Sequence, residues 1–212
     1  MATGTNFIGG WMMSHIKSMV VVAGVVMLAS CVTLFKPVND KSNIKGVRLA
    51  VVPGINEKTN IMFARQFAEE FGRSTKFKVQ SHADTMGRLG QYGEIQGPYR
   101  KGHIDYFDAW DKTDRAKLTD IQKRLGVDNL YVVWATREKI SEQTGSKVLQ
   151  VETYTQFFAF PGAVEIGQAK FDVTYAEGFV IGAKVPRNRE DAIKQVAPPV
   201  VKEVAEKTGY SK

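Results

Sequence analysis

The chain has 212 residues and a formal net charge of +7 at pH 7, from 29 Lys and Arg against 22 Asp and Glu. Its single cysteine, Cys31, excludes an intramolecular disulfide. The basic residues are dispersed along the chain, which argues against nucleic-acid binding. The charge instead favours anionic lipid head groups, an acidic glycan or an acidic protein surface.

The N-terminal region has the plan of a secretory signal, with Lys17 followed by an uncharged apolar run that ends in small residues. The sequence of residues 28–31, Leu-Ala-Ser-Cys, resembles the lipobox of bacterial lipoproteins. The resemblance implies cleavage between Ser30 and Cys31 and acylation of the Cys31 thiol. We therefore interpret residues 1–30 as a lipoprotein signal peptide, and two or more acyl chains would hold the mature chain stably on a membrane.

Residues 18–35 carry no charge and approach the minimum length of a transmembrane helix, so an N-terminal anchor in the inner membrane is the alternative. Residues 32–46, with the sequence VTLFKPVNDKSNIKG, are polar towards their end, and we interpret residues 31–46 as the lipidated cysteine and a tether. Val32 stands where lipoproteins retained in the inner membrane of enteric bacteria have aspartate. We therefore expect an outer-membrane anchor with the domain facing the periplasm.

The first elements of the folded part form a β-α-β unit. Residues 47–54, VRLAVVPG, are a nearly continuous apolar run that predicts a buried strand. Residues 59–72 carry apolar side chains at helical spacing, with Thr59 or Asn60 as the N-cap. Residues 76–81, KFKVQS, alternate as a strand does, and a right-handed crossover would make the two strands parallel.

Glycines interrupt the next part of the chain. Residues 83–111 hold five glycines besides Pro98, which predicts only short helices, around residues 85–89 and 105–109. A clearer helix follows over residues 114–125 and ends at a glycine. Residues 127–139 then predict a third strand.

The last part of the chain predicts antiparallel strands and a terminal helix. Residues 148–160 and 169–185 alternate between polar and apolar side chains, and a turn at 141–147 precedes them. In the terminal helix, Pro198-Pro199 predicts a break or a kink. We therefore predict a single α/β (α+β) domain over residues 47–208, with a mixed sheet begun by the β-α-β unit, extended by antiparallel meander strands and covered by helices.

The order of these elements resembles a group of bacterial envelope domains. The stretches that carry the resemblance are VRLAVVPGINEKTN, FARQFAEEFGRSTKFKVQS and IQKRLGVDNLYVVWATREK. The group includes the N-terminal domain of the Tol-Pal translocation protein, the curli secretion lipoprotein, the lipoprotein activators of peptidoglycan synthases and the lipoprotein of Pel polysaccharide export. The resemblance covers residues 47–205 and implies a non-enzymatic accessory domain that docks on, regulates or multimerises within an envelope machine.

The sequence contains no GxSxG nucleophile elbow, no P-loop and no GxGxxG turn after a strand. His82 and His103 do not have the spacing of metal ligands. A hydrolase that uses paired carboxylates such as Asp108 and Asp111 is the remaining enzymatic alternative. We predict that the protein is not an enzyme and binds no metal and no cofactor.

Residues 92–111, YGEIQGPYRKGHIDYFDAWD, are the segment that most favours a binding function. Aromatic and basic side chains gather there on a glycine-rich loop, and Tyr, Trp and Arg are common anchors of protein interfaces. The same side chains can stack on sugar rings, and they can also bury one side of a short helix. The candidate partner- or glycan-binding residues are Tyr99, Arg100, Lys101, Tyr106, Phe107 and Trp110.

Together these observations predict a lipid-anchored accessory protein that docks on or regulates an envelope assembly, export or cell-wall machine. Its expected partners are the membrane, through acyl chains on Cys31, envelope proteins and further copies of this chain. The alternative is a lipoprotein that binds an acidic polysaccharide or peptidoglycan.

Overall fold

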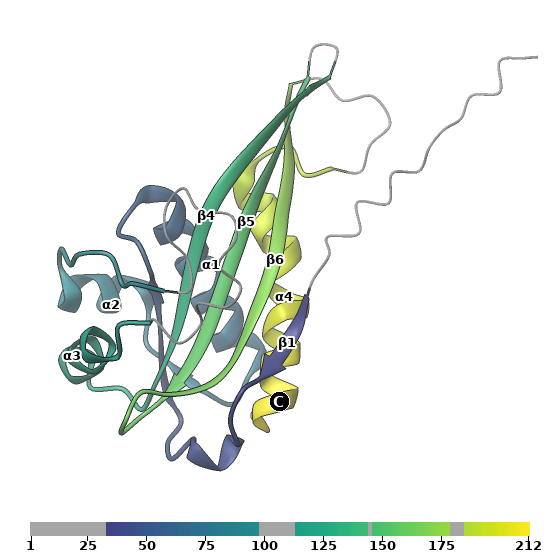
Figure 1. The fold of residues 1–212 in the computed structure, drawn as a ribbon. Helices are drawn as coiled ribbons and strands as arrows, with labels where there is room; N and C mark the ends of the chain where they lie inside the picture. The colour runs from purple at the N-terminus through teal and green to yellow at the C-terminus, as the bar shows by residue number, and fades with distance from the viewer. Residues whose placement is uncertain (1–32, 98–112, 144–145, 179–184) are drawn as a thin grey trace, which may run out of the picture.

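The computed structural model describes residues 33–97, 113–143, 146–178 and 185–212. These residues form one six-stranded sheet, in the order β1-β6-β5-β4-β2-β3, with helices packed on both of its faces (Figure 1). None of the helices so described is both long and apolar enough for a membrane span. The elements are β1 (Thr33–Pro37), the 3-10 turn η1 (Lys41–Asn43), β2 (Arg48–Pro53), α1 (Lys58–Ser74), β3 (Lys78–Val79), α2 (His82–Leu89), α3 (Arg115–Leu125), β4 (Asn129–Gln143), β5 (Ser146–Ala159), β6 (Val164–Gly178) and α4 (Arg189–Thr208).

The sheet has a parallel half and an antiparallel half, which confirms the predicted mixed α/β class. Strand β2 pairs in parallel with β3 and with β4, whereas β4, β5 and β6 form an antiparallel meander. The predicted turn at 141–147 is wrong for residues 141–143 and 146–147, because β4 extends to Gln143 and β5 begins at Ser146. The three long strands project past the helices (Figure 1). We call the ends of these strands the arm, residues 139–143, 146–148 and 176–178.

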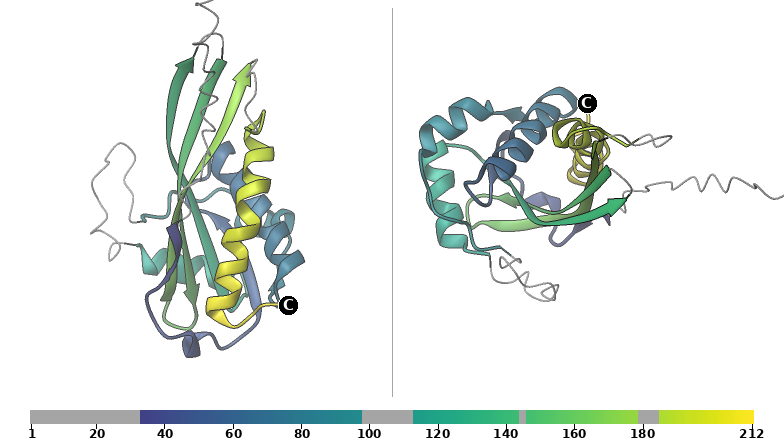
Figure 2. Two further views of the ribbon diagram at one scale, coloured as in Figure 1. Left: turned by 90° about the vertical axis from the view of Figure 1, so that its right-hand side faces the viewer. Right: turned by 90° about the horizontal axis from the view of Figure 1, so that it is seen from above.

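Two separate hydrophobic cores lie on the two faces of the sheet. Successive residues of a strand point to opposite faces, so Leu49 and Val51 of β2 belong to one core and Ala50 and Val52 to the other. Helices α1 and α4 cover the first face, and α2 and α3 cover part of the second (Figure 2). Both faces of β2 are therefore buried, which explains its continuous apolar sequence.

Tyr131 of β4 stands at the centre of the first core. Its ring packs edge-on against Phe71 of α1, with the ring centroids 4.8 Å apart, and is stacked with Phe67 at 5.7 Å. Burial raises the pKa of the Tyr131 phenol, whose hydroxyl donates to Thr155 Oγ1 at 2.7 Å. The one polar atom that this ring brings into the core is thus paired.

The prediction of a tether is wrong for residues 33–46. Residues Thr33–Pro37 form β1, which pairs antiparallel with β6 and closes that edge of the sheet. Phe35 and Ile44 are buried in the first core, and Val38 and Asn39 both donate backbone hydrogen bonds to Ile166 O. The segment is short and polar, but burial of its two large apolar side chains holds it on the domain.

The predicted break at Pro198-Pro199 does not occur, because α4 is one helix over Arg189–Thr208. The two prolines remove the backbone donors that would bond the carbonyls of Lys194 and Gln195. Both of those residues are exposed, so water can satisfy their carbonyl groups. The buried face of α4, which includes Val196, Val200, Val201 and Val204, keeps the helix on the sheet.

Arg189 attaches the strands at the root of the arm to the helices. Its Nη2 lies 2.9 and 3.0 Å from the two carboxylate oxygens of Glu138, and its Nε donates to the Tyr175 hydroxyl at 3.0 Å. Its Nη1 donates to Thr59 Oγ1 at 2.6 Å. Thr59 therefore does not cap α1, whose N-cap residue is Glu57. The guanidinium joins β4, β6, α1 and α4 at the root of the arm.

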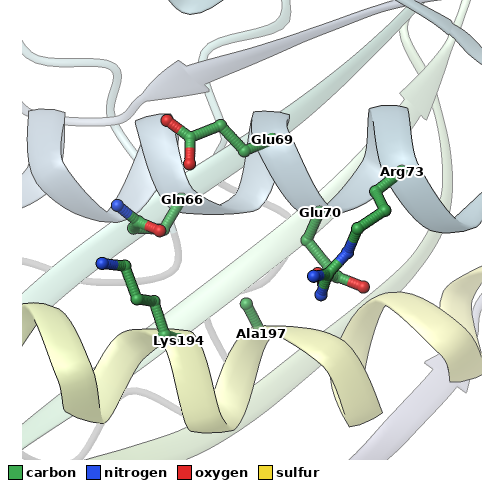
Figure 3. Close-up of a pocket in the computed structure, with 6 residues that line it drawn as sticks. All are labelled: Gln66, Glu69, Glu70, Arg73, Lys194 and Ala197. Carbon is green, nitrogen blue, oxygen red and sulfur yellow. The ribbon is translucent and has the colours of Figure 1, made fainter.

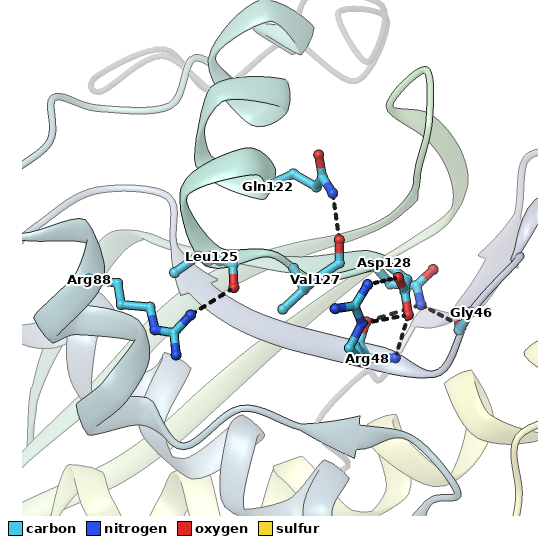
Figure 4. Close-up of polar contacts among 8 residues, drawn as sticks. Gly46, Arg48, Arg88, Gln122, Leu125, Val127 and Asp128 are labelled. Carbon is cyan, nitrogen blue, oxygen red and sulfur yellow. Dashed lines mark hydrogen bonds and ion pairs between the residues drawn. The ribbon is translucent and has the colours of Figure 1, made fainter.

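Asp128 joins the two central parallel strands just before β4 (Figure 4). Its carboxylate accepts from Arg48 Nη2 at 2.7 Å, from Arg48 Nε at 3.2 Å and from the Arg48 backbone N–H at 3.0 Å. The hydrogen bonds from the Arg48 side chain hold the pKa of Asp128 below its ordinary value. A Cβ at residue 46 would lie 2.3 Å from Asp128 Oδ2, so glycine is needed there.

The substitution Asp128→Asn should lower the Tm at pH 7 by about 1 to 3 °C, because an ion pair with an exposed guanidinium contributes modestly. The native pKa of Asp128 lies below the unfolded value of about 3.9. The carboxylate therefore stabilises the fold above about pH 4, and this contribution is lost as the pH falls through the native pKa. Thermal unfolding at pH 7 and pH 3 should give a smaller difference between wild type and variant at pH 3. An equal difference at both values would contradict this account.

Candidate functional site

The side chains that the sequence nominated for binding lie outside the described residues. This holds for Ser30 and Cys31 and for the six candidates in segment 98–112, which are Tyr99, Arg100, Lys101, Tyr106, Phe107 and Trp110. The helix predicted around 105–109 lies outside them as well. The structure does describe the residues that flank segment 98–112, up to residue 97 and from residue 113, and the surface that they contact.

The residues that flank segment 98–112 are hydrogen-bonded to each other and to the sheet. The Asp114 backbone N–H donates to Gln96 O at 2.9 Å, which closes the base of the loop. The Ile95 N–H donates to Gly54 O at 2.8 Å, so the chain that leads into segment 98–112 is hydrogen-bonded to the residue that follows β2. On the outgoing side, Thr113 Oγ1 donates to Gln156 Oε1 of β5 at 2.9 Å. We call Gly54, residues 95–97, Thr113 and Trp134 the loop base.

Trp134 of β4 is the centre of the loop base. Its side chain is fully buried, and its indole N–H donates to Ile95 O at 3.1 Å. A Cβ on Gly54 would lie 2.1 Å from the indole Nε1, and a Cβ on Gly97 would lie 2.7 Å from Cε2. The indole is therefore held between two backbone segments that only glycine brings so close.

Tyr92 is the one aromatic residue of segment 92–111 that the structure describes. Its hydroxyl donates to Pro53 O at 2.6 Å, and burial raises its pKa. The ring packs against the second core. Tyr92 therefore supports the approach to the loop base and is not available as a contact for a partner.

Beside the loop base, the second face of β5 and β6 is polar and has no helix packed on it among the described residues, because α2 and α3 pack on β2 and β4 (Figures 1 and 2). In register, Tyr154 lies opposite Lys170, and Gln156 lies opposite Gln168. Lys170 Nζ stands 5.1 Å from the centroid of the Tyr154 ring. We call this surface the polar sheet face, residues Gln150, Glu152, Tyr154, Gln156, Gln168, Lys170 and Asp172.

Three atoms of the polar sheet face are buried without a hydrogen-bond partner. They are Gln156 Nε2, Gln168 Oε1 and Asp172 Oδ1. The other oxygen of Asp172 accepts from Gln150 Nε2 at 2.7 Å, and the other polar atom of Gln156 accepts from Thr113. Buried polar groups in native proteins are nearly always paired. One donor and two acceptors of this face therefore have no hydrogen-bond partner among the described residues.

A groove of about 310 Å³ lies between α1 and α4 on the opposite side of the sheet (Figure 3). Gln66 and Glu70 of α1 line it and are largely buried. Glu70 accepts from Arg73 and from Ser74, and Gln66 donates to Glu190 at 3.3 Å. Lys194 also pairs with Glu190, at 3.1 Å. The charged side chains of the groove thus pair with one another and join two helices.

Among the described residues, no group of three or more His, Cys, Asp or Glu side chains is arranged as a metal site. His82, whose spacing in the sequence did not favour a metal site, begins α2 and is half-buried. Burial, followed by the charge of Arg65, lowers its pKa.

Sequence reasoning predicted neither the loop base around Trp134 nor the polar sheet face. Trp134 was expected only as an apolar strand residue, and its role depends on Gly54 and Gly97, which lie far from it in the chain. The polar sheet face did leave a signal, because β5 and β6 carry polar side chains at every second position. Such alternation predicts a strand with one face outside the core, but does not show that two such faces adjoin.

Comparison with known proteins finds no matching family model and no matching curated protein sequence. Solved structures with a distantly similar chain course include lipoprotein GNA1162 from Neisseria meningitidis, with 14% identity and a TM-score of 0.43 over 76% of this chain and 99% of that chain. A PelC dodecamer from Paraburkholderia phytofirmans has 10% identity and a TM-score of 0.40 over 84% and 97%. The hypothetical protein CT253 from Chlamydia trachomatis has 11% identity and a TM-score of 0.39 over 77% and 96%.

The substitution Gly97→Ala should destabilise the protein by about 1 to 3 kcal/mol, because the added methyl group forces the buried indole of Trp134 to move. Gly87→Ala is the matched control, since a Cβ on Gly87 meets nothing within 4 Å. In α2 it should be neutral or stabilise by up to about 1 kcal/mol. Chemical unfolding measures both free energies. Equal effects of the two substitutions would show that the glycine contact does not hold the loop base.

Proposed function

We propose that this protein is a lipid-anchored, periplasm-facing accessory protein that docks on a protein machine of the bacterial envelope and is not itself an enzyme. The observation that carries the proposal is the loop base. A segment rich in Tyr, Trp, Arg and Lys starts and ends on a rigid platform of the sheet. Fixed ends lower the ordering cost that a loop pays on binding.

The sequence around Cys31 supports the anchor. It has the residue order of a lipobox, and the domain begins almost directly after it, because β1 starts at Thr33. Strand β1 also takes Thr33, Leu34 and Phe35 from the uncharged stretch 18–35. Residues 18–32 are fewer than the 17 to 25 or so that a spanning helix needs. This favours acylation over a transmembrane anchor.

The docking role can be tested by crosslinking in intact cells. Wild-type protein should recover a specific envelope protein, and the double substitution Trp110→Ala and Arg100→Ala should reduce the recovery at least about tenfold, since interface anchors of these types each contribute on the order of 2 kcal/mol. Lys123→Ala, on the exposed side of α3, is the control and should recover as much as wild type. The Tm of each variant shows whether it is folded.

An unchanged recovery by a folded double variant would contradict docking through this segment. A chain that stays monomeric in light scattering and recovers no protein at all would contradict the docking role itself. Mass spectrometry of the native product tests the anchor separately, because acylation adds a defined mass to Cys31.

The polar sheet face favours a second candidate function, the binding of a glycan. A sugar presents hydroxyl groups that both donate and accept, which is what Gln156 Nε2, Gln168 Oε1 and Asp172 Oδ1 require. The net charge of +7 suits an acidic polysaccharide or peptidoglycan.

Co-sedimentation with purified cell-wall sacculi tests this second function. Asp172→Asn should reduce the bound fraction about tenfold, because it removes a charged acceptor and about 1.4 kcal/mol of hydrogen bonding. Trp110→Ala with Arg100→Ala should reduce it further if the segment contributes. Glu206→Gln, an exposed carboxylate of α4, is the charge-matched control. If Asp172→Asn sediments like the control, the polar sheet face is not a glycan site.

A further inference from the structure

The connection between the proposed acylation site and the sheet is very short. Only Val32 separates Cys31 from Thr33, the first residue of β1. Two steps along the chain span at most about 7 Å. The acyl chains therefore leave the protein within about 7 Å of the Thr33 backbone.

Thr33 lies near the middle of the longest edge of the sheet. Strand β1 is the outermost strand, and Thr33 is opposite Lys170 of β6. At about 3.3 Å per residue, β6 continues about 26 Å from Lys170 to its end at Gly178 in the arm. In the other direction it extends about 20 Å, to Val164. The domain thus reaches well past the anchor point at both ends.

This position restricts how the domain can stand on a bilayer. With the strands perpendicular to the membrane, either the arm or the opposite end of the sheet would have to enter the lipid, because the connection is much shorter than either overhang. The arm carries exposed charged side chains, Lys139, Glu142 and Lys147, and the opposite end of the sheet carries Asp40, Lys41 and Lys45. Charged side chains in the hydrocarbon region are costly, so perpendicular orientations are excluded.

The edge beside the anchor has the chemistry of a surface that meets lipid head groups. Lys36 is exposed there. Val38, in the same stretch, is 48% exposed and one of two large apolar side chains exposed among the described residues. A lysine attracts anionic head groups, and a single valine beside it can reach the interface.

We propose that this edge, which we call the anchor edge and define by Lys36 and Val38, lies on the phospholipid surface that holds the acyl chains, with the strands parallel to the bilayer. The inference rests on the proposed acylation of Cys31. It places the loop base three strands away from the membrane, about 14 Å at ~4.8 Å per strand. The segment that starts there remains accessible to a partner.

Fluorescence quenching on vesicles tests the orientation. The acylated protein is incorporated into phosphatidylethanolamine and phosphatidylglycerol vesicles that contain a lipid with a nitroxide on its head group. A fluorophore is attached to Val38→Cys or, as the control, to Lys123→Cys on the exposed side of α3. Cys31 does not react, because its sulfur carries the lipid. Quenching at position 38 should exceed quenching at position 123 at least about threefold.

A ten-residue Gly-Ser insertion between Val32 and Thr33 supplies the missing tether. It should reduce quenching at position 38 at least twofold, since the domain can then leave the surface. Equal quenching at positions 38 and 123 of the acylated protein would overturn the orientation and leave the docking proposal intact. Quenching that the insertion does not reduce would show that the short connection does not set the orientation and would overturn the inference. A product without acylation of Cys31 would overturn both proposals.

Discussion

The contact of Trp134 with Gly54 and Gly97 is the constraint on which the candidate site depends. The indole fills the space between the ends of two parallel strands and the residues that flank segment 98–112. Its N–H donates to the backbone carbonyl of Ile95. A smaller side chain would leave a cavity, and a Cβ on either glycine would displace the ring. Trp134, Gly54 and Gly97 thus form a rigid support at the edge of the β-α-β unit, and the residues on both sides of segment 98–112 are attached to it.

The distribution of helices over the sheet explains where a polar face without a helix on it can occur among the described residues. Strands β2 and β4 are apolar on both faces where they pair, and both faces are covered. In β5 and β6 most apolar residues face α1 and α4. Phe158 and Tyr154 of β5 belong to the second core, and the rest of the opposite face is polar. Apolar burial is what attaches a helix to a sheet, so α2 and α3 lie over the first pair of strands only. The polar sheet face and the loop base adjoin because the change from two apolar faces to one occurs between β4 and β5.

Local patterns in the sequence were sufficient to predict the class of fold, because the β-α-β unit and the meander each have a clear apolar period. They were not sufficient for β1, whose pairing with β6 joins residues far apart in the chain and whose five residues include a lysine and a proline. A short edge strand has no period of its own, and only the burial of Phe35 on the folded sheet distinguishes it from a tether. The predicted break at Pro198-Pro199 was wrong for a related reason. The helix continues because Lys194 and Gln195 are exposed and water can bond their carbonyl groups, and this exposure is a property of the folded domain and not of the helix alone.

The binding residues nominated in segment 98–112 stay a prediction, because they lie outside the described residues. The composition of segment 92–111 by itself favours binding, whereas the side chains that support the segment, Trp134, Thr113 and Gln156, come from separate elements and have ordinary neighbours in the chain. The anchor edge and the loop base lie on different strands of one rigid sheet, so the height of the loop base above a membrane follows from the fold once the anchor is given. With a flexible tether of fifteen or so residues, the loop base could lie at any distance up to about 50 Å from the membrane. Pairing of β1 with β6 removes that freedom, and a partner embedded in the same membrane then meets the loop base at a nearly constant distance, which raises its effective concentration at the site.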